Sequence, residues 1–192
     1  TRQYATKGYL EKLIAQVFTG RERFEPGNPQ EGYSPSPQER QSWLQISYMK
    51  EAYHTMGPKF TLGWMAEALY SSKNFSENYT ATMMQAGEFA PTPHSKLMYN
   101  EAFRANHYVA AGIKPIYVLN DMFQFRTEFY GFTPIFPIKK NALNKAYYGK
   151  AFSRFEYMGE VSVICHLPFG AISAYVNHYS SPRREWNVGM TI

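Results

Sequence analysis

The chain has 192 residues, a length typical of one domain, and its hydrophobic share of 44% excludes wholesale disorder. Its net charge of +5 is modest, and the densest basic cluster is Ser181-Pro182-Arg183-Arg184 in a predicted loop, so nucleic acid is not an expected partner. A single cysteine, Cys165, excludes a disulfide framework and a cysteine-based metal site, and no apolar run approaches the ~20 residues of a transmembrane helix.

Aromatic residues make up 17% of the chain, which is unusually high. Such residues fit pleated, half-buried β surfaces, and Tyr and Trp also gather where a protein crosses from lipid to water. The composition therefore favours a β protein, either soluble or in a membrane.

Period-two alternation of apolar and polar residues is the dominant pattern, and it predicts about eight strands. In chain order they span 9–19, 43–53, 60–70, 107–117, 123–130, 157–167, 171–178 and 186–192. The clearest is 123–130. Its one face holds Phe123, Phe125, Thr127 and Phe129, and its other face holds Gln124, Arg126, Glu128 and Tyr130.

The lengths of the connections alternate along the chain. Long connections over 20–40, 71–105 and 134–155 alternate with short ones over 55–59, 119–122 and 168–170, and 180–185 is intermediate. Outer-membrane barrels have short turns on one side and long loops on the other. We therefore predict an all-β, antiparallel meander of about eight strands that is part of a larger transmembrane β-barrel and forms one domain over 1–192. The stretch 81–89 could instead form a short helix within its loop.

In such a barrel the apolar face meets lipid and the polar face lines the lumen. The residues expected in the lumen are Arg126, Glu128, Glu160, Glu67 and Lys114. We expect Arg126 to pair with Glu128 on the same strand or with Glu160 on the next one. Aromatic residues near strand ends should form interfacial girdles. They are Phe60, Tyr70, Tyr117, Phe123, Tyr157 and Trp186.

A soluble, aromatic-rich β module that binds a lipid or glycan would show the same alternation, with its polar face in water. The ordering of loop lengths and the placement of the aromatic residues favour the membrane barrel. Carbonate or urea washing of membranes would separate the two hypotheses.

Motifs for catalysis are missing from the sequence. It has no Gly-x-Ser-x-Gly turn, no His-Glu-x-x-His and no Gly-rich phosphate loop. None of the five histidines has metal-ligand spacing to a second His or to Cys, so ordinary polar or interfacial roles are favoured. We expect no catalytic residue, no metal and no cofactor in this chain.

Four segments carry a resemblance to a known family. They are Pro91-Thr92-Pro93-His94-Ser95-Lys96, Phe103-Arg104-Ala105-Asn106, the stretch 110–117, and 160–168 followed by Trp186-Asn187-Val188-Gly189. Together they are similar to the C-terminal surface-antigen-type barrel of bacterial patatin-like phospholipases. The resemblance covers most of the chain, from about Tyr9 to Ile192.

The resemblance implies a location in the bacterial outer membrane and a role as anchor or translocation pore for a lipid hydrolase. The patatin-like catalytic domain would lie upstream, and both ends of this chain are expected to be cuts. Its partners would be outer-membrane lipid, the upstream domain and the barrel-assembly machinery. Related transporters keep an arginine in a long loop that folds back into the barrel, and Arg104 resembles it, although Ala105 replaces the usual glycine. A plain loop arginine at a strand start is the alternative for Arg104.

Overall fold

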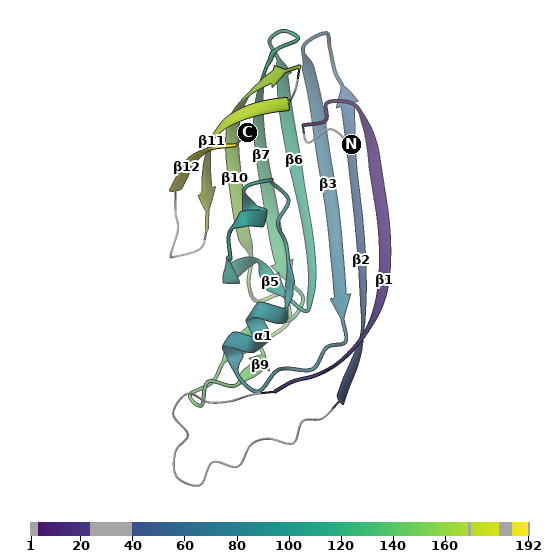
Figure 1. Ribbon diagram of the computed structural model, residues 1–192, viewed down its shortest axis with the longest axis vertical. Helices are drawn as coiled ribbons and strands as arrows, with labels where there is room; N and C mark the ends of the chain where they lie inside the picture. The colour runs from purple at the N-terminus through teal and green to yellow at the C-terminus, as the bar shows by residue number, and fades with distance from the viewer. Residues whose placement is uncertain (1–3, 24–39, 169, 181–185, 192) are drawn as a thin grey trace.

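A computed structural model describes residues 4–23, 40–168, 170–180 and 186–191. It contains one antiparallel sheet of eight long strands in the order β1-β2-β3-β6-β7-β10-β11-β12, so every strand pairs with its neighbours along the chain (Figure 1). The strands are β1 (Gly8–Arg21), β2 (Arg40–Thr55), β3 (Phe60–Ser71), β6 (His107–Val118), β7 (Phe123–Pro134), β10 (Glu156–Leu167), β11 (Gly170–Tyr179) and β12 (Trp186–Thr191). The predicted eight-stranded antiparallel meander is confirmed.

The remaining elements of the described residues lie in two of the long connections. The connection between β3 and β6 holds α1 (Tyr79–Gln85), β4 (Gly87–Glu88), η1 (Ser95–Leu97), η2 (Glu101–Phe103) and β5 (Arg104–Ala105). The connection between β7 and β10 forms a hairpin of β8 (Ile138–Lys140) and β9 (Ala146–Tyr148). The helix suggested over 81–89 is present but begins earlier and ends earlier. The hairpin was not predicted, because three-residue strands are too short to show alternation.

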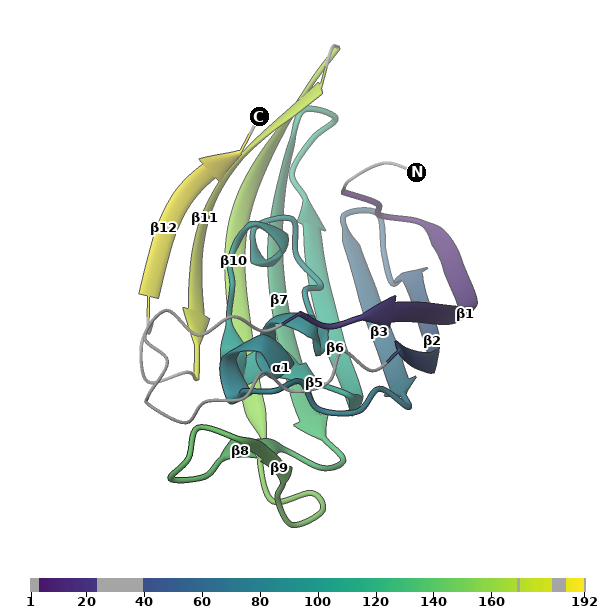
Figure 2. The same cartoon turned by 60° about the horizontal axis from the view of Figure 1, so that its bottom comes forward.

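The sheet is strongly curved, and the connection 72–106 lies in its hollow (Figure 2). We call this side the concave face and the opposite side the convex face. Aromatic residues of the connection fill the hollow. Phe89 contacts the rings of Tyr108 on β6 and of Tyr130 and Phe132 on β7, with centroids 6.1, 6.0 and 5.8 Å away. Phe103 joins the same buried cluster. The core therefore lies between the sheet and its own long loop.

Two glycines allow tyrosines to lie flat on the concave face. Gly112 pairs with Tyr130 across β6 and β7, and a Cβ on Gly112 would stand 2.1 Å from the Tyr130 ring. Gly63 pairs with Tyr53 across β2 and β3, and a Cβ there would stand 2.7 Å from that ring. Aromatic rings over glycines pin the register of curved sheets.

The two faces of the sheet have inverted polarity. On β7 Phe125 and Phe129 are 46% and 49% exposed on the convex face, while Arg126 and Glu128 are 3% and 5% exposed on the concave face. The predicted separation of these side chains onto two faces is confirmed. Exposed apolar residues of neighbouring strands continue the convex band. They include Val109, Ile113, Tyr117, Val161, Val163, Val176, Val188 and Met190.

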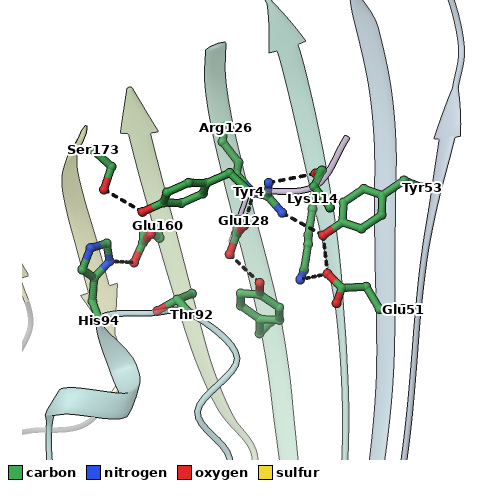
Figure 3. Close-up of polar contacts among 12 residues, drawn as sticks. Tyr4, Glu51, Tyr53, Thr92, His94, Lys114, Arg126, Glu128, Glu160 and Ser173 are labelled. Atoms are coloured by element: carbon green, nitrogen blue, oxygen red, sulfur yellow. Dashed lines mark hydrogen bonds and ion pairs between the residues drawn. The ribbon is translucent and has the colours of Figure 1, made fainter. Parts of the chain in front are cut away.

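One ion pair interrupts the convex band. Glu51 and Tyr53 of β2 point to the concave face (Figure 3), so Lys50 points to the convex one, where it faces Glu11 of β1. Lys50 Nζ lies 3.3 Å from Glu11 Oε2, and the Tyr48 hydroxyl donates to Glu11 at 2.8 Å. Because the two charges are opposite, this part of the convex face carries no net charge.

Two predictions lie outside the described residues. The long loop predicted over 20–40 falls mostly on 24–39, and the basic cluster at Ser181-Pro182-Arg183-Arg184 falls on 181–185. Of its described residues, 20–21 and 40 extend β1 and β2 beyond the predicted strand ends, and 22–23 follow β1 without strand structure.

Candidate functional site: a buried charge network on the concave face

Strand β7 supplies the centre of the network. Its alternation turns Arg126, Glu128 and Tyr130 toward the hollow, where they are nearly inaccessible to solvent. A buried charge is costly unless it is paired and hydrogen-bonded. The geometry around these side chains shows how each is compensated (Figure 3).

Arg126 has partners on three elements. Its Nε donates to Glu128 and forms an ion pair with it. Its Nη2 donates to the Tyr53 hydroxyl at 2.9 Å, and its Nη1 donates to the Ala5 carbonyl at 3.1 Å. The planar guanidinium carries five donors in a fixed fork, which suits several acceptors at once. The expected pairing of Arg126 with Glu128 is confirmed, and the alternative partner, Glu160, is used elsewhere.

The segment before β1 covers the network. Tyr4 is buried, its hydroxyl lies 2.7 Å from Ser173 Oγ on β11, and its ring centroid lies 6.0 Å from the Arg126 guanidinium carbon. Burial raises the pKa of the Tyr4 phenol above its ordinary value, so the hydroxyl stays protonated. The segment 4–7 thereby connects β7 to β11.

A second pair lies beside the first. Lys114 on β6 forms an ion pair with Glu51 on β2, and the Tyr53 hydroxyl also donates to Glu51. The Tyr53 hydroxyl therefore bridges the two ion pairs, because it accepts from Arg126 and donates to Glu51. Glu51 was not among the predicted site residues. Its place on the polar side of its strand was the available signal, but β3 lies between its strand and that of Lys114 in the sheet.

Glu160 faces Glu128 directly across β7 and β10, which brings two carboxylates onto neighbouring positions of one face. Their partners differ. Tyr130 donates to Glu128 in addition to Arg126. Glu160 Oε2 lies 3.0 Å from His94 Nδ1, and the pair is almost wholly buried. Separate partners compensate the repulsion between these like charges.

His94 joins the loop to three strands. It is 2% exposed, its Nε2 lies 2.7 Å from Thr191 Oγ1 on β12, and its ring stacks on Tyr175 of β11. The sequence predicts only an ordinary polar or interfacial role for His94. No local pattern marks it, because its partners are about 66 to 97 residues away.

Glu67 and Arg104 have other environments. Glu67 accepts a hydrogen bond from the Tyr108 hydroxyl at 2.5 Å and is not paired with Arg126 or Lys114. Arg104 lies in the loop that occupies the hollow, but its guanidinium contacts that loop rather than the sheet. It donates to the carbonyls of Met83, Met84 and Ala86 and pairs with Glu88 at 2.7 Å. Arg104 thus satisfies free carbonyls at the end of α1.

A cavity of about 790 Å³ adjoins the network. The segment 4–10 and the loop residues Pro91, Pro93, Lys96 and Leu97 form one wall, and the charged side chains of the network form the other. Within the described residues no group of three or more His, Cys, Asp and Glu side chains could hold a metal ion. Because the buried charges pair with one another, the arrangement holds strands, loop and N-terminal segment together.

Comparisons with known proteins returned no match. No family model matches the sequence, no curated protein is similar enough to match it, and no solved structure matches the fold. Among the described residues, no helix has the length and apolar character needed to span a membrane.

Proposed function

We propose that this sheet is part of a transmembrane β-barrel in a bacterial outer membrane. In this proposal the barrel serves as anchor or translocation pore for a patatin-like lipid hydrolase whose catalytic domain lies upstream. The observation that carries the membrane placement is the inverted polarity of the faces. Charged side chains are buried on the concave face, and large apolar side chains are exposed on the convex one.

Water is a poor environment for the convex face. Exposed apolar patches beyond a few hundred Å² are rare on soluble monomers and mark interaction surfaces. Strands β3, β6, β7 and β10 have 12 residues each, which meets the ~9–11 that a tilted strand needs to cross a bilayer. Each of these strands has no Asp, Glu, Lys or Arg among its convex-face residues.

Aromatic side chains border the convex band at the long-loop end. Rings of Phe129, Tyr157, His178 and Trp186 follow one another across β7, β10, β11 and β12, with successive centroids 6.0, 5.8 and 4.8 Å apart. Tyr and Trp concentrate at the level of lipid headgroups. A continuous aromatic row across four strands supports an interfacial girdle at this end.

The packed loop favours an anchor or a closed pore over an open channel. Phe89 and Phe103 of the loop are 2% exposed and fill the hollow against β6 and β7, and His94 ties the loop to β10 and β12. The assignment to a patatin-like hydrolase rests on the resemblance of the four sequence segments. It predicts a Gly-x-Ser-x-Gly motif in the sequence upstream of Thr1.

A soluble β module that binds a lipid or glycan is the second candidate. Two observations favour it: the Glu11–Lys50 ion pair on the convex face, and the cavity of about 790 Å³ on the concave side. A lysine in the middle of a lipid-facing band would cost ~2–4 kcal/mol if it were unpaired. The ion pair and the hydrogen bond from Tyr48 reduce that cost.

Extraction and labelling separate the two candidates. In the cells that make it, the full-length protein should remain in the membrane fraction after washing with alkaline carbonate and with urea. A cysteine at Val161, which is exposed on the convex face, should react with a lipid-soluble maleimide but not with a charged one in a Cys165→Ser background. A cysteine at Ser153, exposed in the long connection, is the control and should react with both. Release into the wash, or equal labelling of Val161→Cys by the charged reagent, would refute the membrane proposal.

A further inference from the structure

We propose that the segment 135–155, which contains the β8–β9 hairpin, is a docking surface for the phosphate-bearing headgroups of anionic lipids. The surface would lie beside the membrane at the long-loop end of the sheet. The inference rests on the proposed membrane placement and adds a ligand class to it.

Charge is distributed very unevenly along this chain. The segment 135–155 holds Lys139, Lys140, Lys145, Lys150 and Arg154, and no Asp or Glu. The whole chain has 20 Lys and Arg against 15 Asp and Glu, so the other residues carry 15 of each. The entire formal net charge of +5 therefore equals the charge of this one segment.

Three of the cations are not used by the fold. Lys139, Lys140 and Lys150 are exposed and make neither a side-chain hydrogen bond nor an ion pair within the part of the chain that the structure describes. By contrast, Arg154 donates to the Ala102 carbonyl at 2.8 Å, and Lys145 Nζ lies 3.8 Å from Glu77 Oε1. Free ammonium groups on one segment are available to an external anion.

The same segment exposes large apolar side chains. Leu143, Phe152 and Phe155 are 79%, 63% and 62% exposed. Phe155 lies over Gly131 on the convex face of β7, where a Cβ on that glycine would be 2.9 Å from the ring. Phe155, the last residue of the segment, therefore meets the apolar band, and the lysine-rich surface lies beyond it.

The frame that carries these side chains is ordered. The Gly149 amide donates to the Pro137 carbonyl at 2.8 Å, and the Phe152 amide donates to the Ile135 carbonyl at 2.9 Å. Phe152 has φ 51, a left-handed conformation that is uncommon for a bulky residue and is found where the surroundings enforce it. The hairpin also packs on α1 through Ile138. The lysines are thus presented from a fixed support.

The order in which apolar, aromatic and basic side chains follow one another points to a lipid bilayer as the partner. Moving off the end of the sheet, an apolar band is followed by aromatic rings and then by lysines, which matches hydrocarbon, interface and phosphate in a bilayer. Lysine stems can lie on apolar surface while the ammonium reaches a headgroup. The lysines sit on a projecting hairpin rather than in a pocket (Figure 2), so an extended sheet of headgroups fits better than an isolated phosphate ion.

Lipid competition on the full-length protein tests the proposal. The purified protein is reconstituted into nanodiscs of phosphatidylcholine doped with a trace of fluorescent lipid A, and the preference of the protein's surroundings for lipid A is measured by energy transfer from a dye on the protein. Each lysine near an anionic surface contributes about fivefold in affinity. The triple variant Lys139→Gln, Lys140→Gln, Lys150→Gln should therefore lose about 100-fold in preference for lipid A.

The control variant Lys7→Gln, Lys12→Gln, Lys59→Gln removes the same charge from exposed positions outside the segment and should keep the wild-type preference. Inorganic phosphate at millimolar concentration should not compete. Equal preference in the triple variant and in the control would overturn the proposal, and so would full competition by inorganic phosphate. Failure of all three proteins to insert into phosphatidylcholine nanodiscs would instead refute the membrane placement itself.

Discussion

Arg126→Ala tests whether the buried network holds the sheet together. The substitution leaves Glu128 buried without its cation and removes the donors to the Tyr53 hydroxyl and to the Ala5 carbonyl. Removing one partner of a buried pair costs ~3–5 kcal/mol, whereas an exposed pair is worth ~0–1 kcal/mol.

The burial of this pair indicates a cost in the range of a buried ion pair rather than of an exposed one. The side chains of Arg126 and Glu128 are 3% and 7% exposed, but both line the adjoining cavity, through which water can approach. We therefore expect the free energy of unfolding to fall by about 3 kcal/mol, the lower end of the buried range. The double variant Arg126→Ala, Glu128→Gln should lose less than the sum of the single variants, because it leaves no unpaired charge.

The measurement is urea unfolding of the protein in phosphatidylcholine vesicles, followed by tryptophan fluorescence. Thr127→Ala is the control, because Thr127 is exposed on the opposite face of the same strand and should change stability by no more than ~0.5 kcal/mol. An Arg126→Ala cost below ~1 kcal/mol, or equal to that of the control, would show that the network is solvated and that the reasoning from burial is wrong.

Three further variants test other parts of the structure. Phe125→Arg places a charge on the convex face and should cost ~2–4 kcal/mol in vesicles, while Phe125→Leu should be tolerated; equal stability of the two variants would contradict a lipid-facing band. Gly112→Val forces a side chain into the tyrosine ring across the strand pair and should cost at least ~1–3 kcal/mol in the same assay, whereas Gly170→Ala, with nothing within 4 Å, should be nearly neutral. His94→Ala should increase hydrogen exchange in the segment 89–106 without changing exchange in β6 and β7, and unchanged protection of that segment would show that other contacts hold the loop.

The sequence alone was sufficient to predict the strands and to assign their residues to one or the other face. Side chains alternate with a period of two along any strand, so the positions of Phe125 and Phe129 determine the face of Arg126 without knowledge of the rest of the fold. For the same reason the pairing of Arg126 with Glu128, two residues away, was within reach of sequence reasoning. Which of the two faces is buried could not be read from the alternation, because the alternation is the same in water and in lipid.

Long-range partners depended on the tertiary structure. Lys114 finds Glu51 and not Glu67 because the register of β2, β3 and β6 and the curvature of the sheet bring them together. His94 reaches Glu160 and Thr191 only because the loop folds into the hollow. Local propensity carries no information about either contact.

Arg104 shows the same division between local pattern and tertiary context. The resemblance predicts that Arg104 belongs to a long loop that folds back into the barrel. In the structure the side chain that ties this loop to the sheet is His94, while Arg104 caps the end of α1. Alternation of side chains is a local property of the backbone, and so the sequence by itself determined the strands and which residues share a face. The number of strands and the lengths of their connections then predicted the eight-stranded meander. Register, curvature and loop docking join residues far apart in the chain, and therefore only the tertiary structure decided which charges meet inside the hollow.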